Sequence, residues 1–499
     1  MRRLMRLAVL GLVSFAASAV NAQSPVPAKY SDVRPLPDTP AIRRAREVVD
    51  AINSGSSAQV TALVENSFAP SLRNSAPMER HQAVFANWSG TNQALEVYSA
   101  RTYDPPRAES TAVLIARSRL LETWRGIVVE VEEQEPFGIT SVSVTPARPP
   151  SDLPPAKALE PEQVAHELGA FIDRLAKADV FSGTLLLAKD GKVLLTKAVG
   201  IANRDFDAPV RLDTKFNLGS MNKMFTGTAA MKLVEQGKLS LDDPISKYLD
   251  DSWLPKVDKS KVQVQHLLTH TSGLGSYFNE TYNKSSRLLF RNVDDYKPLV
   301  AEETLAFEPG TRWAYSNTGM LIVGAVIEKA SGMNYFEFVR QHVTGPAGMT
   351  NTDCYELDKV NPNLAVGYQR IMTPRGPEYR NNVFDHVMRG GPAGGGYSTV
   401  EDLYRFAQAL RSGTLLSESG TRELWKPRPE VSSPEYGLGF GTEPTALGRR
   451  VGHGGGFTGI SANLDIYVDS GWTIAVMSNY GGAAPIVAGK ANELILQGR

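Results

Sequence analysis

A cluster of prolines divides this 499-residue chain and sets the first limit on its fold. Proline fixes its own backbone angle and favours extended backbone before it, so such a cluster makes a stiff spacer. A chain of this length also exceeds what one hydrophobic core usually serves. We therefore predict a linker over residues 146–156, between a small domain at 23–145 and a larger domain at 157–499. The linker prolines are Pro146, Pro149, Pro150, Pro154 and Pro155.

The pattern of residues 23–145 predicts helices followed by consecutive strands. Thr39 and Pro40 are typical of a helix start and Gly55 of its end, and a second amphipathic segment follows over 60–68. This order favours a small α+β domain with an antiparallel sheet, which resembles the nuclear-transport-factor-2-like fold in pattern only. We expect a binding or spacer role for it. The predicted strands are Leu95–Tyr103, Thr111–Ser118, Trp124–Glu132 and Ile139–Val144.

Residues 1–22 have the pattern of a secretion signal. A basic start precedes a short apolar run over 7–17, and small residues then form a cleavage site. We expect cleavage after Ala22 and a periplasmic or secreted mature protein. The alternative is an uncleaved anchor, which the shortness of the apolar run disfavours. The residues that carry the signal are Arg2, Arg3, Arg6, Val20, Asn21 and Ala22.

Charge and cysteine content exclude some other classes. Basic and acidic residues balance at 53 each, so the composition does not favour a nucleic-acid partner. Cys354 is the single cysteine, so no internal disulfide can form, and its neighbours do not suggest an activated thiol. We expect Cys354 to fill core space. We expect no cofactor and no metal, and the sequence leaves the oligomeric state open.

The pattern of residues 157–499 predicts sheet strands at both ends of one domain. A helix opens at Pro161, a hairpin turns at Asp190-Gly191, and a closing helix covers Ala484–Leu496. We therefore expect an α/β domain whose helical, loop-rich middle is inserted over the sheet. The predicted strands are Phe181–Lys189, Lys192–Val199, Ser461–Val468 and Trp472–Ser478.

The strongest chemical signal is a serine followed three residues later by a lysine. With Ser220 in the first turn of a buried helix that ends at Gly237, Lys223 lies on the same helix face. A serine hydroxyl needs a neighbour to take its proton, and an amine with a desolvated, lowered pKa can do so. The helix start also offers a backbone N–H to an oxyanion. Alone, this spacing is common by chance.

Two further motifs follow the serine in a fixed order. Tyr315-Ser316-Asn317 lies in the middle of the domain and His453-Gly454-Gly455 near its end. The series Ser-x-x-Lys, Tyr-x-Asn, His-x-Gly resembles the serine β-lactamase and penicillin-binding-protein superfamily over residues 160–499. The most similar branch contains class C β-lactamases, D-alanyl-D-alanine carboxypeptidases, D-aminopeptidases and related esterases. Softer matches lie at His266–Leu274, Glu308–Gly310, Gly345–Thr350, Ala393–Thr399 and Tyr436–Phe440.

The resemblance implies a fold and a role for each motif residue. The fold is a β-lactamase/transpeptidase-like domain, with an antiparallel sheet flanked by helices. Ser220 becomes acylated, while Lys223 and Tyr315 share its proton, and which of the two is the formal base stays open. The lysine charge would favour a phenolate at Tyr315. Asn317 would bind the acyl side chain or Lys223, and the oxyanion would lie between the backbone N–H groups of Ser220 and Gly456.

His453 is the departure from many β-lactamases, which have Lys-Thr-Gly at this motif. A histidine is mostly neutral near pH 7, so we expect weak binding of a substrate carboxylate that improves toward about pH 6. Gly455 would let its strand pass close to the substrate. We therefore expect an exported serine hydrolase that acts through a Ser220 acyl-enzyme on small D-amino-acid peptides, amides or esters. The alternatives are a class C-like β-lactamase and a non-catalytic penicillin- or cell-wall-binding protein.

Two other patterns in the larger domain receive structural interpretations. His266 and His270 have the spacing of a metal-binding pair, but Leu267 stands where a metalloprotease has its glutamate, so we expect structural roles. The glycine-rich stretch 390–396 lacks the Gly-Lys-Ser/Thr of a phosphate loop, and we expect it to form a wall of the active-site cleft.

Overall fold

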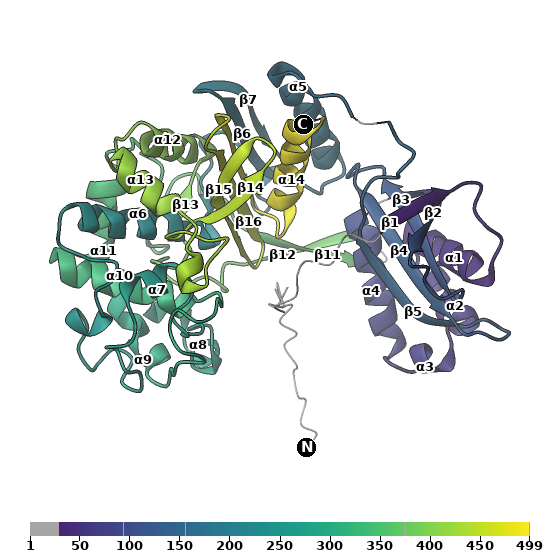
Figure 1. Ribbon diagram of the computed structural model, residues 1–499, viewed down its shortest axis with the longest axis horizontal. Coiled ribbons are helices and arrows are strands. Elements are labelled where there is room, and N and C mark those ends of the chain that lie inside the picture. The colour runs from purple at the N-terminus through teal and green to yellow at the C-terminus, as the bar shows by residue number, and fades with distance from the viewer. Residues whose placement is uncertain (1–28, 93, 155, 374–375, 499) are drawn as a thin grey trace. The chain divides into compact units, whose positions relative to one another are not determined.

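The computed structural model describes residues 29–92, 94–154, 156–373 and 376–498, so the predicted signal sequence lies outside the described residues. The chain divides into two compact units (Figure 1). The first comprises residues up to Ser89 together with Ala94–Leu153, and the second comprises Pro154–Arg499 together with Gly90–Gln93.

The first unit is built on a five-stranded antiparallel sheet whose spatial order follows the chain, β1-β2-β3-β4-β5. The four strands expected from the sequence are confirmed as β2 to β5, and β1 adds an edge strand that the pattern did not indicate. The strands are β1 Lys29–Val33, β2 Leu95–Asp104, β3 Thr111–Ser118, β4 Trp124–Val131 and β5 Ile139–Pro146. The helices are α1 Pro40–Ser54, α2 Ser57–Ser67, α3 Pro70–Arg73 and α4 Met78–Asn92.

Helix α1 forms as the sequence predicts and buries one face on the sheet. The Thr39 hydroxyl accepts a hydrogen bond from the backbone N–H of Ile42 at 3.3 Å, and Gly55 ends the helix in the left-handed region at φ +60°. Its apolar stripe, buried against β2, β3 and β4, is Ala41, Ile42, Ala45, Val48, Val49 and Ile52. The likeness of this unit to the nuclear-transport-factor-2-like fold stays a prediction.

A buried ion pair ties the edge strand of this sheet to the segment predicted as a linker. The Arg101 guanidinium donates to Asp32 at 3.1 Å, and the two side chains are 4% and 0% exposed. Arg101 also donates to the carbonyls of Arg148 and Pro149, while Asp32 accepts from the backbone N–H of Ser151 at 2.8 Å. The first half of the proline-rich stretch therefore packs on the first unit instead of serving as a free spacer.

We predict that Asp32→Asn destabilises the first unit by about 3 kcal/mol, because it leaves the Arg101 charge buried without its counter-ion. Hydrogen–deuterium exchange of the β1 and β2 amides in the whole protein measures this loss. The matched control is Glu96→Gln, which neutralises the exposed partner of Arg119 and should leave the protection of β1 and β2 nearly unchanged. Equal protection in the two variants would contradict the assigned role of the pair.

The second unit is built on a six-stranded sheet that joins the two ends of the domain. Its order is β14-β15-β16-β17-β6-β7, and every neighbouring pair is antiparallel. β17 pairs directly with β6, as the prediction of sheet strands at both ends requires. The strands are β6 Gly183–Lys189, β7 Lys192–Val199, β14 Gly441–Thr445, β15 Gly448–Phe457, β16 Ile460–Tyr467 and β17 Trp472–Ser478.

Helices cover both faces of this sheet (Figure 1). α5 (Pro161–Lys177) and α14 (Ala483–Leu496) pack together against β7, β16 and β17. On the other side lie α12 (Val400–Arg411), the 3-10 turn η1 (Gly219–Met221) and α6 (Asn222–Glu235). This mixed architecture confirms the predicted helix-flanked antiparallel sheet.

The segment between β7 and β14 supplies the helical middle of the domain. Its other helices are α7 Val264–Leu268, α8 Glu280–Lys284, α9 Lys297–Val300, α10 Asn317–Ser331, α11 Tyr335–Val339 and α13 Glu418–Trp425. Short two-stranded pairs lie among them, formed by β8 Ile201–Asn203 with β9 Ala208–Pro209, β10 Phe216–Asn217 with β13 Tyr397–Ser398, and β11 Tyr368–Thr373 with β12 Gly376–Asn381.

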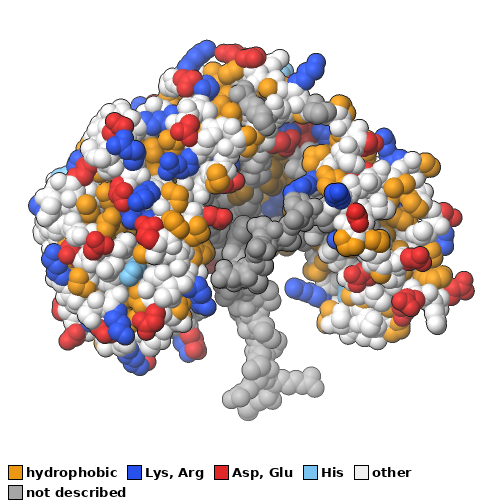
Figure 2. All heavy atoms as spheres, in the orientation of Figure 1, with side chains coloured by type: hydrophobic (Ala, Val, Ile, Leu, Met, Phe, Trp, Pro, Cys, Tyr) orange, Lys and Arg blue, Asp and Glu red, His pale blue; other side chains and the backbone are white. Residues whose placement is uncertain are grey.

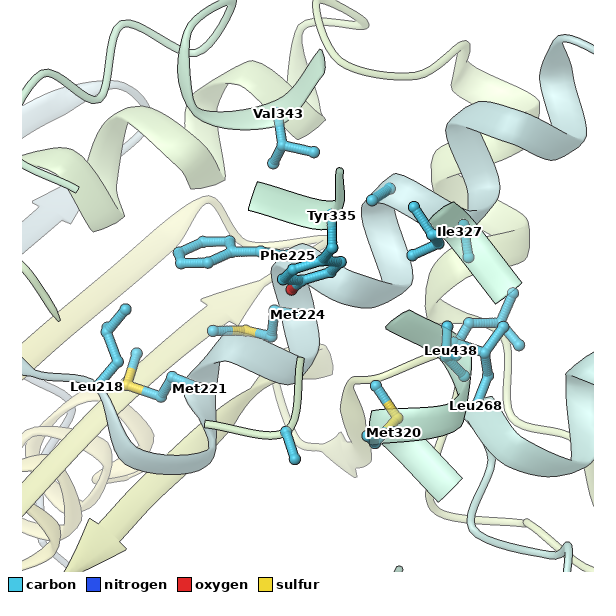
Figure 3. Close-up of a cluster of buried hydrophobic side chains, with 14 of the residues drawn as sticks. Leu218, Met221, Met224, Phe225, Leu268, Met320, Ile327, Tyr335, Val343 and Leu438 are labelled. Carbon is cyan, nitrogen blue, oxygen red and sulfur yellow. The ribbon is translucent and has the colours of Figure 1, made fainter. Parts of the chain in front are cut away.

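Helix α6 is the buried centre of this helical region. A helix that is buried nearly all round must be enclosed by other elements, and α6 is enclosed by α10, α11, α13 and β15. Figure 3 shows Met224 and Phe225 among side chains from these and neighbouring segments, including Leu268, Met320 and Tyr335. The helix that follows Ser220 is therefore fixed by packing along its length.

The surface carries both signs of charge. On the face shown in Figure 2, basic and acidic side chains are interspersed, which agrees with the balanced composition. In the part of the chain that the structure describes, no helix combines the length and the apolar character that crossing a membrane requires.

Candidate active site

Ser220 lies in the tight turn η1, immediately before α6, where the chain passes close to strand β15. A Cβ on Gly455 would lie 1.9 Å from the Leu218 carbonyl oxygen and 3.2 Å from the Ser220 nitrogen. Gly219 has φ +50°, and a Cβ there would lie 2.6 Å from the Gly456 nitrogen. Only glycine permits both approaches. They bring the backbone of Gly456 beside Ser220, where the sequence predicted the two oxyanion donors.

Lys223 is fully buried, and its amine is held by two acceptors. Nζ donates to Asn317 Oδ1 at 2.9 Å and to the Ala393 carbonyl at 2.6 Å. Desolvation lowers the pKa of Lys223 well below its ordinary value. A neutral amine has two N–H groups, which these bonds use, and one lone pair. The arrangement therefore suits a neutral amine whose lone pair is free of both bonds.

Tyr315 lies over this amine and remains accessible from solvent. Its side chain is 39% exposed, and the centre of its ring is 4.7 Å from Lys223 Nζ. Desolvation raises the pKa of Tyr315 to about 12, although a hydrogen bond with the Ser220 side chain acts in the opposite direction. This direction contradicts the phenolate expected from the lysine charge. The two shifts together favour a phenol at Tyr315 and a neutral amine at Lys223.

Asn317 occupies the first position of α10 and connects two walls of the site. The Ser316 hydroxyl caps this helix by accepting from the Gly319 N–H at 2.7 Å. Asn317 Nδ2 donates to the Ser276 hydroxyl at 3.2 Å, while its oxygen accepts from Lys223. The bond to Lys223 is one of the two contacts expected for Asn317.

His270 accepts two hydrogen bonds from the segment that carries Tyr315, one on each side of that residue in the sequence. Its backbone carbonyl accepts from the N–H of Ala314 at 2.8 Å, and its Nδ1 accepts from the N–H of Ser316 at 3.2 Å. Its ring centre lies 4.4 Å from that of Tyr315. The side chain is fully buried, and desolvation lowers the pKa of His270 well below its ordinary value, so Nδ1 stays an acceptor.

The sequence interpretation of His270 as structural therefore missed its link to the site. The signal that could have found it is its place within the motif-like stretch His266–Leu274. His266 makes a separate bond, accepting at Nδ1 from the Gln263 N–H at 3.2 Å. Trp313 and Tyr436 complete an aromatic wall around His270, with ring centres 5.9 Å and 4.7 Å from its own.

His453 projects from β15 beside this wall, as its motif predicts. Its ring centre is 6.4 Å from that of Tyr315 and 5.8 Å from that of Tyr436. Desolvation, and then the nearby charge of Lys223, lowers the pKa of His453 to about 4. The neutral imidazole expected at pH 7 agrees with this direction, but the expected gain toward about pH 6 is wrong. His453 stays neutral there because its protonation requires a more acidic solution.

The glycine-rich stretch packs against the catalytic turn, as expected for a wall of the site. The Gly395 N–H donates to the Gly219 carbonyl at 3.1 Å, and the Leu218 N–H donates to the Gly396 carbonyl at 2.7 Å. Cys354 lies behind this wall, where burial raises the pKa of its thiol to about 12. The thiol is thus core material, as predicted.

Comparison with known proteins agrees with this geometry. The family model described as Beta-lactamase matches residues 168–497. A penicillin-binding protein of Bacillus subtilis (strain 168) is 32% identical over 329 residues, which cover 62% of this chain and 71% of that protein. Esterase EstB of Burkholderia gladioli is 28% identical over 322 residues, which cover 58% of this chain and 81% of that protein. A D-stereospecific amidohydrolase from Streptomyces sp. has a structure similar at TM-score 0.55 and 25% identity, covering 68% of this chain and all of that one.

The fold and the site thus define a serine hydrolase of the serine β-lactamase and penicillin-binding-protein superfamily. Within it, the chain belongs to the family whose model carries the description Beta-lactamase.

Two substitutions of His270 test whether its hydrogen bonds keep Tyr315 in position. His270→Asn keeps an acceptor near the Nδ1 position and tolerates the backbone φ of +62°, so kcat should stay within about tenfold of wild type. His270→Ala loses the acceptor and should lower kcat by roughly a hundredfold, because small displacements of catalytic groups are costly. Ester hydrolysis and thermal melting measure both. Equal losses in two folded variants would contradict a positioning role.

The lowered pKa of Lys223 predicts the direction of the pH dependence. The neutral amine is the form that accepts a proton, so the acylation rate should rise with pH through that pKa and then level off. Lys223→Arg keeps a cation that does not deprotonate and should abolish acylation. The rate of fluorophosphonate labelling between about pH 5 and pH 9 measures both effects. A rate that falls with rising pH would exclude Lys223 as the base.

Proposed function

We propose that this chain is an exported serine hydrolase that acts through a Ser220 acyl-enzyme on small D-amino-acid peptides, amides or esters. The observation that carries the proposal is the buried Lys223 amine, held by Asn317 and Ala393 three residues after a serine that contacts Tyr315. Such an amine can take the serine proton without a metal or an organic cofactor.

The proposed reaction has two steps. The Ser220 Oγ forms a bond to the substrate carbonyl carbon while Lys223 takes its proton, and the oxyanion lies against the backbone N–H groups of Ser220 and Gly456. As the bond to the leaving group breaks, Tyr315 donates its proton to that group and regains one from Lys223. Water then attacks the acyl-enzyme in the same way and releases the acid and free Ser220.

Two observations support small peptides, amides and esters over β-lactams. His453 is neutral at its place in the third motif, so it gives no charge-assisted bond to a carboxylate. Similar proteins also include an esterase and a D-stereospecific amidohydrolase. A class C-like β-lactamase remains the alternative, because a relative is named for binding penicillin. Its test is a direct comparison of cephalosporin, ester and D-peptide hydrolysis.

Labelling of the whole protein with a fluorescent fluorophosphonate tests the acyl-enzyme. Wild type should be labelled at Ser220, and Ser220→Ala should lose labelling and turnover while keeping its melting temperature. Residual turnover within about tenfold of wild type would exclude Ser220 as the nucleophile, since its loss should cost far more. A fluorescent penicillin that binds non-covalently, without any labelling, would instead favour the non-catalytic binding protein.

We predict that His453→Lys raises kcat/KM for a chromogenic cephalosporin by roughly tenfold to a hundredfold, because it supplies a cation for the carboxylate. The same variant should change hydrolysis of a neutral nitrophenyl ester much less. For wild type, the cephalosporin rate should show no gain between about pH 7 and pH 6, since the pKa of His453 is about 4. Efficient cephalosporin hydrolysis by wild type would mean that another residue holds the carboxylate.

Export is part of the proposal and rests on the sequence of residues 1–22. Expression of the full chain in a Gram-negative host, followed by fractionation and N-terminal sequencing, tests it. A mature protein that begins at Gln23 in the periplasm or medium is the expected result. A full-length cytoplasmic product would contradict it.

A further inference from the structure

One face of strand β15 is directed toward the catalytic turn. The residues on this face therefore lie along the site in the order in which they follow each other in the strand. The strand pairs regularly with β16 from His453 to Phe457, so residues 453, 455 and 457 lie on the same face. Gly455 is the position on this face where an added Cβ would meet the backbone of Leu218 and Ser220. His453 and Phe457 therefore flank the nucleophile on opposite sides, each about 7 Å along the strand from Gly455.

The His453 side and the Phe457 side of Ser220 would contact different parts of a substrate. Tyr315 and its proton lie on the His453 side, where the two ring centres are 6.4 Å apart. A leaving group must receive that proton, so it departs on this side. The rest of the acyl group then extends the other way, toward Phe457.

Three rings from three separate segments converge on that other side. Phe278 stacks on Phe457 with ring centres 5.9 Å apart, and the His386 ring lies 5.7 Å from Phe457. Phe278 and Phe457 are 40% and 38% exposed. Exposed aromatic rings grouped beside a catalytic centre mark a place where a ligand covers them.

Buried aromatic residues hold this surface rigid. Phe278 packs on Tyr277 and edge-on against Tyr282, with ring centres 4.6 Å and 4.9 Å away. Tyr282 in turn stacks on the buried Phe290. Two residues before Phe278, the Ser276 hydroxyl accepts from Asn317. The ring is thus fixed in place relative to the catalytic groups, which lowers the entropy lost on binding.

We propose that Phe278, Phe457 and His386 form an apolar subsite that binds an aromatic or branched aliphatic acyl group of the substrate. The proposal rests on the proposed function and narrows its substrate class. A stacked aromatic pair with a neighbouring ring offers an edge and two faces to a planar or branched apolar group. A small acyl group such as acetyl cannot reach it from Ser220.

Hydrolysis of two nitrophenyl esters by the whole protein tests the subsite. Wild type should have a higher kcat/KM for nitrophenyl phenylacetate than for nitrophenyl acetate. Phe278→Ala should lower the phenylacetate value roughly tenfold to a hundredfold and change the acetate value less than about twofold. The matched control is Phe206→Ala, which removes an equally large ring that is 82% exposed and should alter neither ester.

The outcomes separate this proposal from the acyl-enzyme itself. If wild type is labelled at Ser220 and hydrolyses both esters equally, the subsite is overturned and the proposed function stands. Equal losses on both esters in Phe278→Ala would assign Phe278 a structural role and also overturn the subsite. If Phe278→Ala does not fold, Phe278→Leu replaces it and should favour an isovaleryl over a phenylacetyl ester. Absence of Ser220 labelling in wild type would overturn the proposed function first.

Discussion

The burial of one amine organises the active site. Lys223 lies inside a helix that is enclosed on nearly all sides, and water does not compensate its charge there. The protein satisfies its N–H groups with one side chain from α10 and one carbonyl from the glycine-rich segment. Three stretches of chain that are far apart in sequence therefore meet at a single nitrogen. Desolvation, which in an ordinary lysine would only be destabilising, here lowers the pKa of the amine and so favours its neutral form.

Close backbone contact is the second requirement, and glycine provides it. β15 can run beside the catalytic turn only because Gly455 and Gly219 carry no side chain where the two backbones meet. The same strand then places an imidazole on one side of Ser220 and a phenyl ring on the other. If the proposed subsite is correct, the groups that act on the leaving group and on the acyl group lie at alternate positions of one strand.

The order of three motifs was enough to predict the superfamily, and helix and strand periodicity predicted the main elements of both units. Four features could not be read from local sequence because they depend on burial or on contacts between distant segments. These are the two hydrogen bonds that His270 accepts from the Tyr315 segment, the raised pKa of Tyr315, the lowered pKa of His453, and the contact of Phe278 with Phe457. The packing of the proline-rich stretch could not be read from local sequence either. Its first half is bound to the first unit by hydrogen bonds from the distant Arg101.

The pairing of β17 with β6 has a consequence for how the protein is made. During synthesis, Ser220 and Lys223 leave the ribosome before β15, β16 and β17, so the early chain lacks the strand that lies beside the Ser220 turn. The strands β6 and β7 also lack their neighbour in the sheet until β17 is made. The six-stranded sheet is therefore complete only after β17 has been made, because β17 joins β16 to β6.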